Sequence, residues 1–196
     1  MATPSTLHDA WLEELRDLYN AEKQITKALP KMAKNATAAP LADAFESHLR
    51  ETLGQIKRLE QAFESVGETA RSKTCEGMAG ILEEGKDLMS EDFDEAAMDA
   101  CLIAAAQKVE HYEIASYGAV VAWAKAMGHD EAARLLQTTL DEEKAADEKL
   151  TALAESGINE QAASIAHGEE EEEEEATVAA PRSPASRGRQ TSRGRR

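Results

Sequence analysis

Residues 107–123 read QKVEHYEIASYGAVVAW and place two glutamates in an otherwise apolar pattern. The stretch has no proline, its one glycine comes late, and its small and apolar residues recur with helical spacing. Glu110 and Glu113 fall where such a helix would present its apolar face. A buried carboxylate costs free energy unless a partner neutralises it. The stretch therefore predicts a core helix whose two acidic side chains need a counter-charge.

Apolar stripes of the same period predict four long helices. Pro30 is expected to kink or break the first of them, because proline lacks the amide hydrogen that a helix interior uses. Gly128 is expected to end the third, as glycine ends many helices. No segment alternates with period two over a strand's length, so no sheet is expected. The four helices cover about residues 6–35, 41–67, 95–127 and 130–155.

The lengths of the connections predict the arrangement of these helices. Short links place consecutive helices antiparallel, whereas the connection over about residues 68–94 is long and has its own short amphipathic piece around 78–89. A helix of about 27 residues is about 40 Å long, and a connection of this length can cross it. The second and third helices can then run parallel, as in a ferritin-like four-helix bundle with one long crossover. Other four-helix topologies also fit the pattern.

The composition supports one helical domain and excludes some partners. The chain has 196 residues, of which 42% are hydrophobic and 4% aromatic, and it is long enough for a sizeable core. Alanine, leucine, glutamate and lysine dominate, which favours helices. The net charge of −16 argues against electrostatic binding of the body to nucleic acid or to an anionic membrane.

Cysteine usage and the N-terminal residues predict a cytoplasmic protein. Cys75 and Cys101 have no CxxC spacing, so we interpret both as reduced and structural. The first residues lack the basic and apolar regions of a secretory signal. The longest apolar run is too short to cross a bilayer.

The C-terminal residues differ from the rest of the chain. Residues 169–175 are all glutamate, and six arginines follow among small residues and prolines. Because like charges repel and neither block can bury apolar area, we expect a disordered tail over 159–196, with a short helix around 160–166. Such a tail either keeps the protein soluble or contacts nucleic acid weakly through its arginines. The predicted domains are thus a flexible 1–5, a bundle over 6–158 and the tail.

Each predicted helix interrupts its apolar stripe with polar residues near its middle. Side chains three or four positions apart share a helix face, so these interruptions point inward together. They offer six carboxylates and one imidazole at comparable depth. The residues are Glu22 on the first helix, His48 and Glu51 on the second, Glu110 and Glu113 on the third, and Glu143 and Asp147 on the fourth.

A dinuclear metal centre accounts for this coincidence. No lysine or arginine falls on the same stripes to pair with the carboxylates, and an unpaired buried cluster would be untenable. Two divalent ions would supply four positive charges. A carboxylate-rich site with one histidine suits iron, or manganese as the alternative, better than structural zinc. Bridging carboxylates hold such ions about 3.5–4 Å apart.

Each residue also has a simpler interpretation when it is considered alone. Glu22 fits a boundary residue whose carboxylate reaches water, and His48 fits a hydrogen-bonded core histidine. His111 and Glu142 point away from their ligand neighbours and fit the boundary of the bundle. Tyr19, Tyr112 and Tyr117 fit aromatic packing or hydrogen bonding to the cluster.

Long segments of the sequence resemble the bacterial DUF892 group, the YciF/YciE-like stress proteins. These segments are DLYNAEKQITKALPKMA, AFESHLRETLGQIKRLE, CEGMAGILEEG, QKVEHYEIASYG and LLQTTLDEEKAAD, and the resemblance covers about residues 5–155. It implies a dimeric ferritin-like bundle with a di-iron or related centre, a role in stress responses, and the same seven ligand positions. The acidic and arginine-rich tail is not part of the family pattern.

The ligand pattern departs from the wider ferritin-like scheme, which uses two Glu-x-x-His motifs. Here the second helix has the reversed order His48-Leu-Arg-Glu51, and the third and fourth helices supply no obvious inward histidine. The predicted site is therefore richer in oxygen and poorer in nitrogen. This difference leaves the identity of the metal and its redox chemistry open.

Three classes of function fit these observations. The first is a dimetal oxidoreductase that reduces oxygen or peroxide. The second is metal binding or iron handling without turnover. The third is a metal-free helical stress or scaffold protein that acts through partners, with its inward carboxylates protonated or hydrated.

Overall fold

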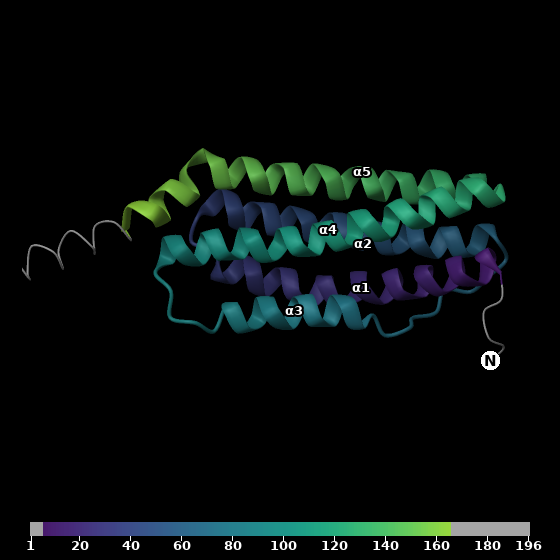
Figure 1. Ribbon diagram of the computed structural model, residues 1–196, viewed down its shortest axis with the longest axis horizontal. Helices are drawn as coiled ribbons and strands as arrows, with labels where there is room; N and C mark the ends of the chain where they lie inside the picture. Colours follow the sequence, from purple (N-terminus) through teal and green to yellow (C-terminus); the bar gives the residue numbers. More distant parts are fainter. Residues whose placement is uncertain (1–5, 166–196) are drawn as a thin grey trace, which may run out of the picture. The chain divides into compact units, whose positions relative to one another are not determined.

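The computed structural model describes residues 6–165, and every regular element within them is helical (Figure 1). This confirms the expected all-α class. The predictions for residues 1–5 and for the acidic and arginine-rich stretch lie outside the described residues. The helices are α1 (Leu7–Asn35), α2 (Ala39–Ser65), α3 (Glu76–Leu88), α4 (Glu95–Met127) and α5 (Asp130–Leu153).

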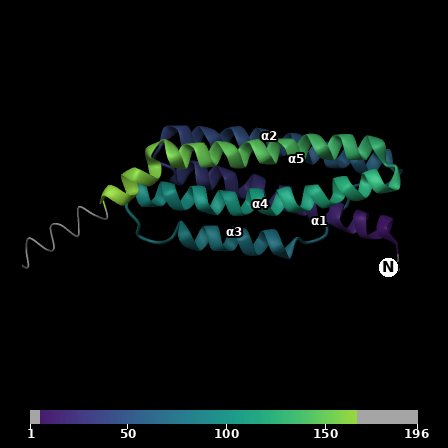
Figure 2. The ribbon, with the colours of Figure 1, turned by 45° about the horizontal axis from the view of Figure 1, so that its top comes forward.

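Four long helices form a bundle, within the unit Met1–Ala163, and α3 lies against its side. In Figure 1, α1 and α5 run in one direction while α2 and α4 run in the other. Around the bundle, α1 contacts α2 and α4, and α5 contacts the same two helices. The segment with α3 carries the chain back along the bundle beside α1 and α4 (Figure 2). The ferritin-like arrangement with one long crossover is therefore confirmed.

Polar groups fix the ends of the bundle helices. Thr6 and Asp9 form a capping box that satisfies amide groups at the start of α1. Gly128 ends α4 in a left-handed conformation, with φ 74°, which glycine adopts without steric cost. The link between α1 and α2 is held by Asp99 of α4, whose carboxylate accepts hydrogen bonds from the backbone amides of Thr37 and Ala38 at 2.8 Å each. These contacts define the start of α1, the end of α4 and the link between α1 and α2.

Two sequence-based expectations concern the continuity of α1 and the end of α5. Pro30 does not break α1, which continues to Asn35. Pro30 is on the exposed face of the helix, where water can hydrogen bond a carbonyl that the proline leaves without a donor. At the other end, α5 is followed by a kink in η1 (Ala154–Ile158), where Gly157 takes a non-helical φ of 126°, and residues 159–165 are again helical. These residues match the short helix expected around 160–166, at the start of the stretch assigned to the tail.

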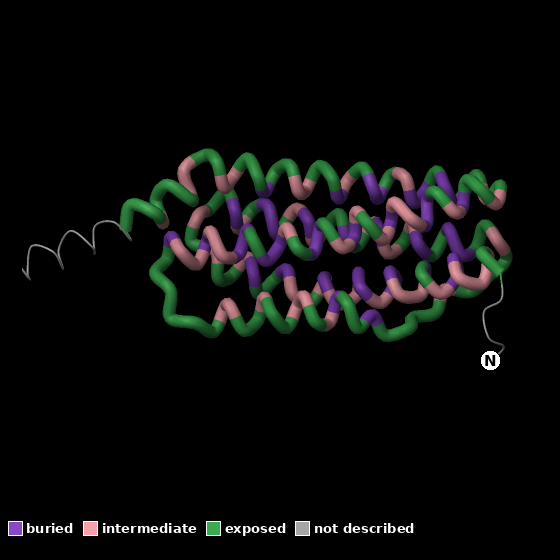
Figure 3. The backbone as a smooth tube through the Cα atoms, in the orientation of Figure 1, coloured by how far each residue is buried: buried purple, intermediate pink, exposed green. Residues whose placement is uncertain are grey.

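Buried positions recur along the long helices of the bundle (Figure 3), and the apolar side chains at these positions form two clusters. One apolar cluster includes Trp11, Phe63 and Leu136, and the other includes Ile25, Leu41 and Leu102. None of the described helices combines the length and apolar character that a bilayer crossing requires. The buried polar side chains at mid-helix, between the clusters, are Glu22, His48, Thr52, Gln55, Glu110, Glu113, Thr139 and Glu143.

Candidate metal centre

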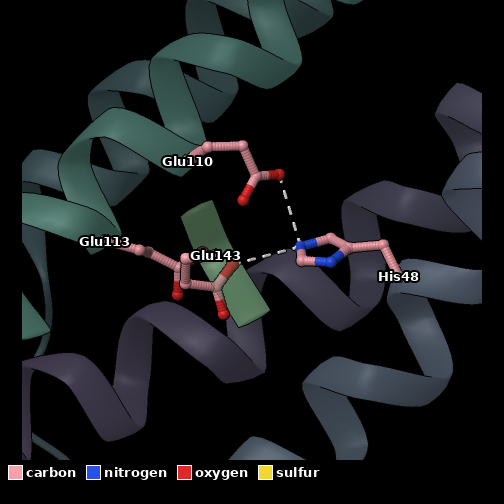
Figure 4. A group of neighbouring side chains, drawn as sticks. All are labelled: His48, Glu110, Glu113 and Glu143. Atoms are coloured by element: carbon pink, nitrogen blue, oxygen red, sulfur yellow. Dashed lines mark ion pairs between the residues drawn. The ribbon is translucent and has the colours of Figure 1, made fainter. Parts of the chain in front are cut away.

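Three helices bring His48, Glu110, Glu113 and Glu143 to one point inside the bundle (Figure 4). Each residue offers one ligand atom, and these four atoms all lie within 4.8 Å of one another. Glu110 and Glu113 come from successive turns of α4, His48 from α2 and Glu143 from α5. The two glutamates of the 107–123 stretch therefore point into the core, as their spacing predicts.

The imidazole of His48 lies against two of these carboxylates. Its Nε2 is 3.3 Å from Glu110 Oε1 and 3.8 Å from Glu143 Oε2 (Figure 4). Its Nδ1 faces the other way, 3.5 Å from Glu51 Oε2. A carboxylate on the second ring nitrogen orients an imidazole toward a metal in many sites. His48 thus presents Nε2 to the interior.

Glu22 adds a fourth buried carboxylate from α1. It is fully buried, and the hydroxyl of Tyr117 donates a hydrogen bond to its Oε1. Its Oε2 has no hydrogen-bond partner. Tyr117 is therefore one of the expected hydrogen-bonding tyrosines, and it fixes one oxygen of Glu22 while leaving the other free to bind.

The structure leaves two of the seven predicted ligands at the edge of the site. The side chain of Glu51 is 46% exposed and meets the site only through His48. Asp147 is partly buried, and its Oδ1 accepts a hydrogen bond from Gln107 at 3.1 Å and lies 3.3 Å from His111 Nε2. Four carboxylates and one imidazole therefore occupy the buried layer, rather than six and one.

Burial and mutual repulsion raise the pKa values of the four buried glutamates. For Glu22, Glu110, Glu113 and Glu143, loss of hydration is the largest cause. The negative charges of neighbouring glutamates add to it at all four. Glu51 behaves differently, because its hydrogen bond with His48 lowers its pKa. In the absence of a cation, the buried layer favours protonated carboxyls.

A hydrogen-bond network on α2 and α5 was not predicted from the sequence. Gln55 donates to Glu143 and, at 3.2 Å, to Glu142. Arg58 donates to Thr139 at 3.0 Å and pairs with Glu142. The spacing of Gln55, seven residues after His48 on one stripe, was the available signal for its position. Arg58 is off that stripe and reaches the network only through its long side chain.

Unpartnered buried atoms show that the donor set fits a cation. A buried oxygen without a hydrogen bond carries an uncompensated desolvation cost, and such atoms are uncommon in folded proteins. Here they concentrate in one layer, on residues whose atoms are oxygen and imidazole ligands. Among the described residues, those in the layer are Glu22 Oε2, His48 Nε2, Gln55 Oε1, Glu110 Oε2, both carboxyl oxygens of Glu113, and Glu143 Oε2; Arg16 Nε is a further such atom outside it.

Comparison with known proteins gives matches over most of the chain. The sequence model of a family described as "Domain of unknown function (DUF892)" matches residues 6–163. The chain is 46% identical over 158 residues to Protein YciF of Escherichia coli (strain K12), covering 80% of this chain and 95% of that protein.

Solved structures also match over most of the chain. The crystal structure of the E. coli stress protein YciF matches with a TM-score of 0.77 and 45% identity, over 80% of this chain and 99% of the other. The protein YcfI of Rhodopseudomonas palustris matches with a TM-score of 0.74 and 47% identity, over 75% and 94%. A Xanthomonas campestris protein at 22% identity, with a TM-score of 0.62 over 84% and 99%, shares the fold.

Proposed function

The chain belongs to the DUF892 family, and from that premise and the buried carboxylate layer we propose that it binds two divalent metal ions, iron or manganese, inside its bundle. A role in stress response is part of the proposal, since the E. coli relative is described as a stress protein. The observation that carries the proposal is the concentration of unpartnered ligand atoms in one buried layer.

Charge balance supports two ions rather than one. The layer holds four carboxylates from Glu22, Glu110, Glu113 and Glu143, and two divalent cations would neutralise them when ionised. Arg58, whose guanidinium lies at the edge of the layer, is already paired with Glu142. Buried charges persist in proteins only when they are paired or bind metal.

The chain's own residues would hold and orient the ligands. Glu22, Glu110, Glu113, Glu143 and His48 supply the donor atoms. The Tyr117 hydroxyl and the Gln55 amide each donate to one carboxyl oxygen and so leave the second oxygen directed to the metal. Iron or manganese, when bound, supplies one-electron chemistry toward oxygen or peroxide.

A metal-free role through partners is the second candidate, and one observation favours it. The raised pKa values of the four buried glutamates would let them remain neutral carboxylic acids without a cation. A protein of this kind needs no ion to fold. Metal content therefore separates the two candidates.

Elemental analysis of protein purified without added metal tests the proposal. We expect about two ions per chain, from the charge balance above. Glu113→Gln removes a fully buried ligand and should reduce that content, whereas Glu46→Gln changes an exposed residue on α2 and should not. Metal-free wild-type protein that takes up no iron or manganese on titration would support the second candidate.

Turnover is tested separately on metal-loaded protein. Wild type should consume peroxide faster than Glu110→Ala loaded under the same conditions. Stoichiometric metal with no difference in peroxide consumption would indicate metal binding or iron handling without this reaction.

A further inference from the structure

A pocket of about 160 Å³ opens between α2 and α5 and reaches the edge of the buried layer. His48 and Glu110 line it, while Glu22, Glu113 and Glu143 do not. The pocket is therefore a route from the surface to one side of the candidate metal centre. Its other lining residues are Ala44, Phe45, Glu51, Glu142, Ala145, Ala146, Lys149 and Leu150.

The size of the pocket exceeds what oxygen or peroxide requires. An apolar cavity of about 150 Å³ is large enough to bind benzene. Half of the lining residues here are alanine, phenylalanine or leucine, with Phe45 and Leu150 as the largest apolar surfaces. A six-membered ring would fit and would bury apolar area on both partners.

The charges around the pocket disfavour an anionic ligand. Glu51 and Glu110 line it, and Lys149 is the cationic side chain among the lining residues. The charge of Glu142 is taken up by its pair with Arg58. A carboxylate or phosphate ligand would meet the ionised Glu51 carboxylate and would lose hydration beside the apolar lining residues, which weakens association. A neutral molecule avoids this cost.

The inner wall offers hydrogen-bonding atoms that lack partners. Glu110 Oε2 and His48 Nε2 are buried and lack a hydrogen bond within the chain, although Nε2 lies 3.3 Å from the other oxygen of Glu110. A hydroxyl can donate to either atom or accept from a protonated one. Satisfying such a buried atom removes a desolvation cost and so favours a ligand with one hydroxyl.

We propose that this pocket binds a neutral, benzene-sized molecule with one hydroxyl group, its ring against Phe45 and Leu150 and its hydroxyl toward Glu110 and His48. That this molecule is the substrate of the metal centre rests on the proposed function. The binding of this molecule to the pocket does not rest on the proposed function, because the pocket and its unpartnered atoms are present without any metal.

Calorimetric titration of metal-free full-length protein with phenol tests the proposal, with benzoate as the anionic comparison. Phenol should bind and benzoate should bind at least about tenfold more weakly. Ala146→Phe places a ring in the pocket and should weaken phenol binding at least about tenfold. Ala145→Phe, at an exposed lining position, is a second blocking variant that should leave the core intact. Ala152→Phe makes the same change on α5 outside the pocket and should have no effect.

Two results would overturn the proposal: no phenol binding to folded wild type, or equal binding to all three variants with unchanged circular dichroism. Metal titration of the same samples keeps the two questions apart. Metal uptake without phenol binding refutes the pocket assignment alone. Phenol binding without metal uptake supports the pocket and refutes the metal proposal.

Discussion

Gln55 on α2 donates a hydrogen bond to Glu143 on α5 inside the polar layer. The donor is a neutral amide, so it fixes one oxygen of the carboxylate without supplying a counter-charge. A lysine or arginine at this position would neutralise Glu143 and weaken its affinity for a cation. Gln55 therefore has the contact expected of a residue that positions a metal ligand, and substitution of Gln55 tests this role directly.

Replacing Gln55 with methionine should lower metal affinity by about 10–100-fold, the usual effect of losing a group that orients a ligand. Methionine is close to glutamine in size but cannot donate to Glu143. A competition titration against a chelator measures the change. Gln61→Met alters an exposed residue of the same helix and is the control. Unchanged affinity in Gln55→Met would mean that Glu143 needs no positioning or binds no metal.

Gly77 and Gly80 on α3 should respond in opposite directions to alanine. A Cβ at Gly77 would lie 2.8 Å from Cε2 of Tyr112, whose hydroxyl donates to Asp17 and contacts Cys75 Sγ. Gly77→Ala should therefore cost about 1–3 kcal/mol through overpacking. Nothing lies within 4 Å of a Cβ at Gly80, so Gly80→Ala should gain about 0.5–1 kcal/mol from helix propensity. Urea unfolding of both variants measures these values, and equal effects would contradict the close approach of Tyr112.

Removing the carboxylate of Asp99 should loosen the connection between α1 and α2. Asp99 is buried and also accepts a hydrogen bond from the Thr37 hydroxyl at 2.6 Å. Asp99→Ala leaves the backbone amides of Thr37 and Ala38 without this acceptor and should cost about 2 kcal/mol, in the range measured for helix caps. Thermal unfolding should show the loss, while Asp43→Ala, at an exposed position on α2, should be nearly neutral. If Asp99→Ala and wild type had the same melting temperature, water would replace the carboxylate as the acceptor at this link.

The sequence was sufficient to predict the helices, their connections and the position of the polar layer along them, because local periodicity and capping determine these features. It was not sufficient to predict how each helix is rotated about its own axis. At about 100° per residue, Gln55 is about 20° from His48 around α2, whereas Glu51 is about 60° away. Both lie on an inward stripe about 100° wide, but only packing decides which part of it faces the centre.

The same geometry explains α5 and the network at the edge of the layer. Asp147 is about 40° from Glu143 around the helix, and it meets Gln107 and His111 instead of the buried carboxylates. Arg58 is not on the inward stripe of α2, but its long side chain still reaches Glu142 of α5. The helical periodicity of the sequence does not predict contacts of this kind. Such contacts depend on tertiary packing and on rotamers, which one sequence does not reveal.

The stability of the metal-free protein should fall as pH rises from about 5 to 8. Glu22, Glu110 and Glu113 have pKa values raised above the ordinary value of 4.5. Above pH 4.5 the unfolded chain releases these protons while the folded chain retains them, so the unfolded state gains in relative stability with each increment of pH. Metal binding requires the ionised forms and should oppose the loss, by about 2.7 kcal/mol at a hundredfold excess over the dissociation constant.

Glu113→Gln provides the sharpest form of this test, because neither oxygen of Glu113 has a hydrogen-bond partner and a neutral amide cannot ionise. Without metal, the variant should lose less stability than wild type between pH 5 and 8 and should be the more stable protein at pH 8. With iron or manganese it should gain less than wild type, since one ligand is missing. Thermal melts across this pH range, with Glu46→Gln as the exposed control, measure both effects. The opposite result has two parts: Glu113→Gln is less stable than metal-free wild type at pH 8, and metal does not stabilise wild type. Together these results would mean that the buried carboxyls have a structural role, and they would favour the metal-free function.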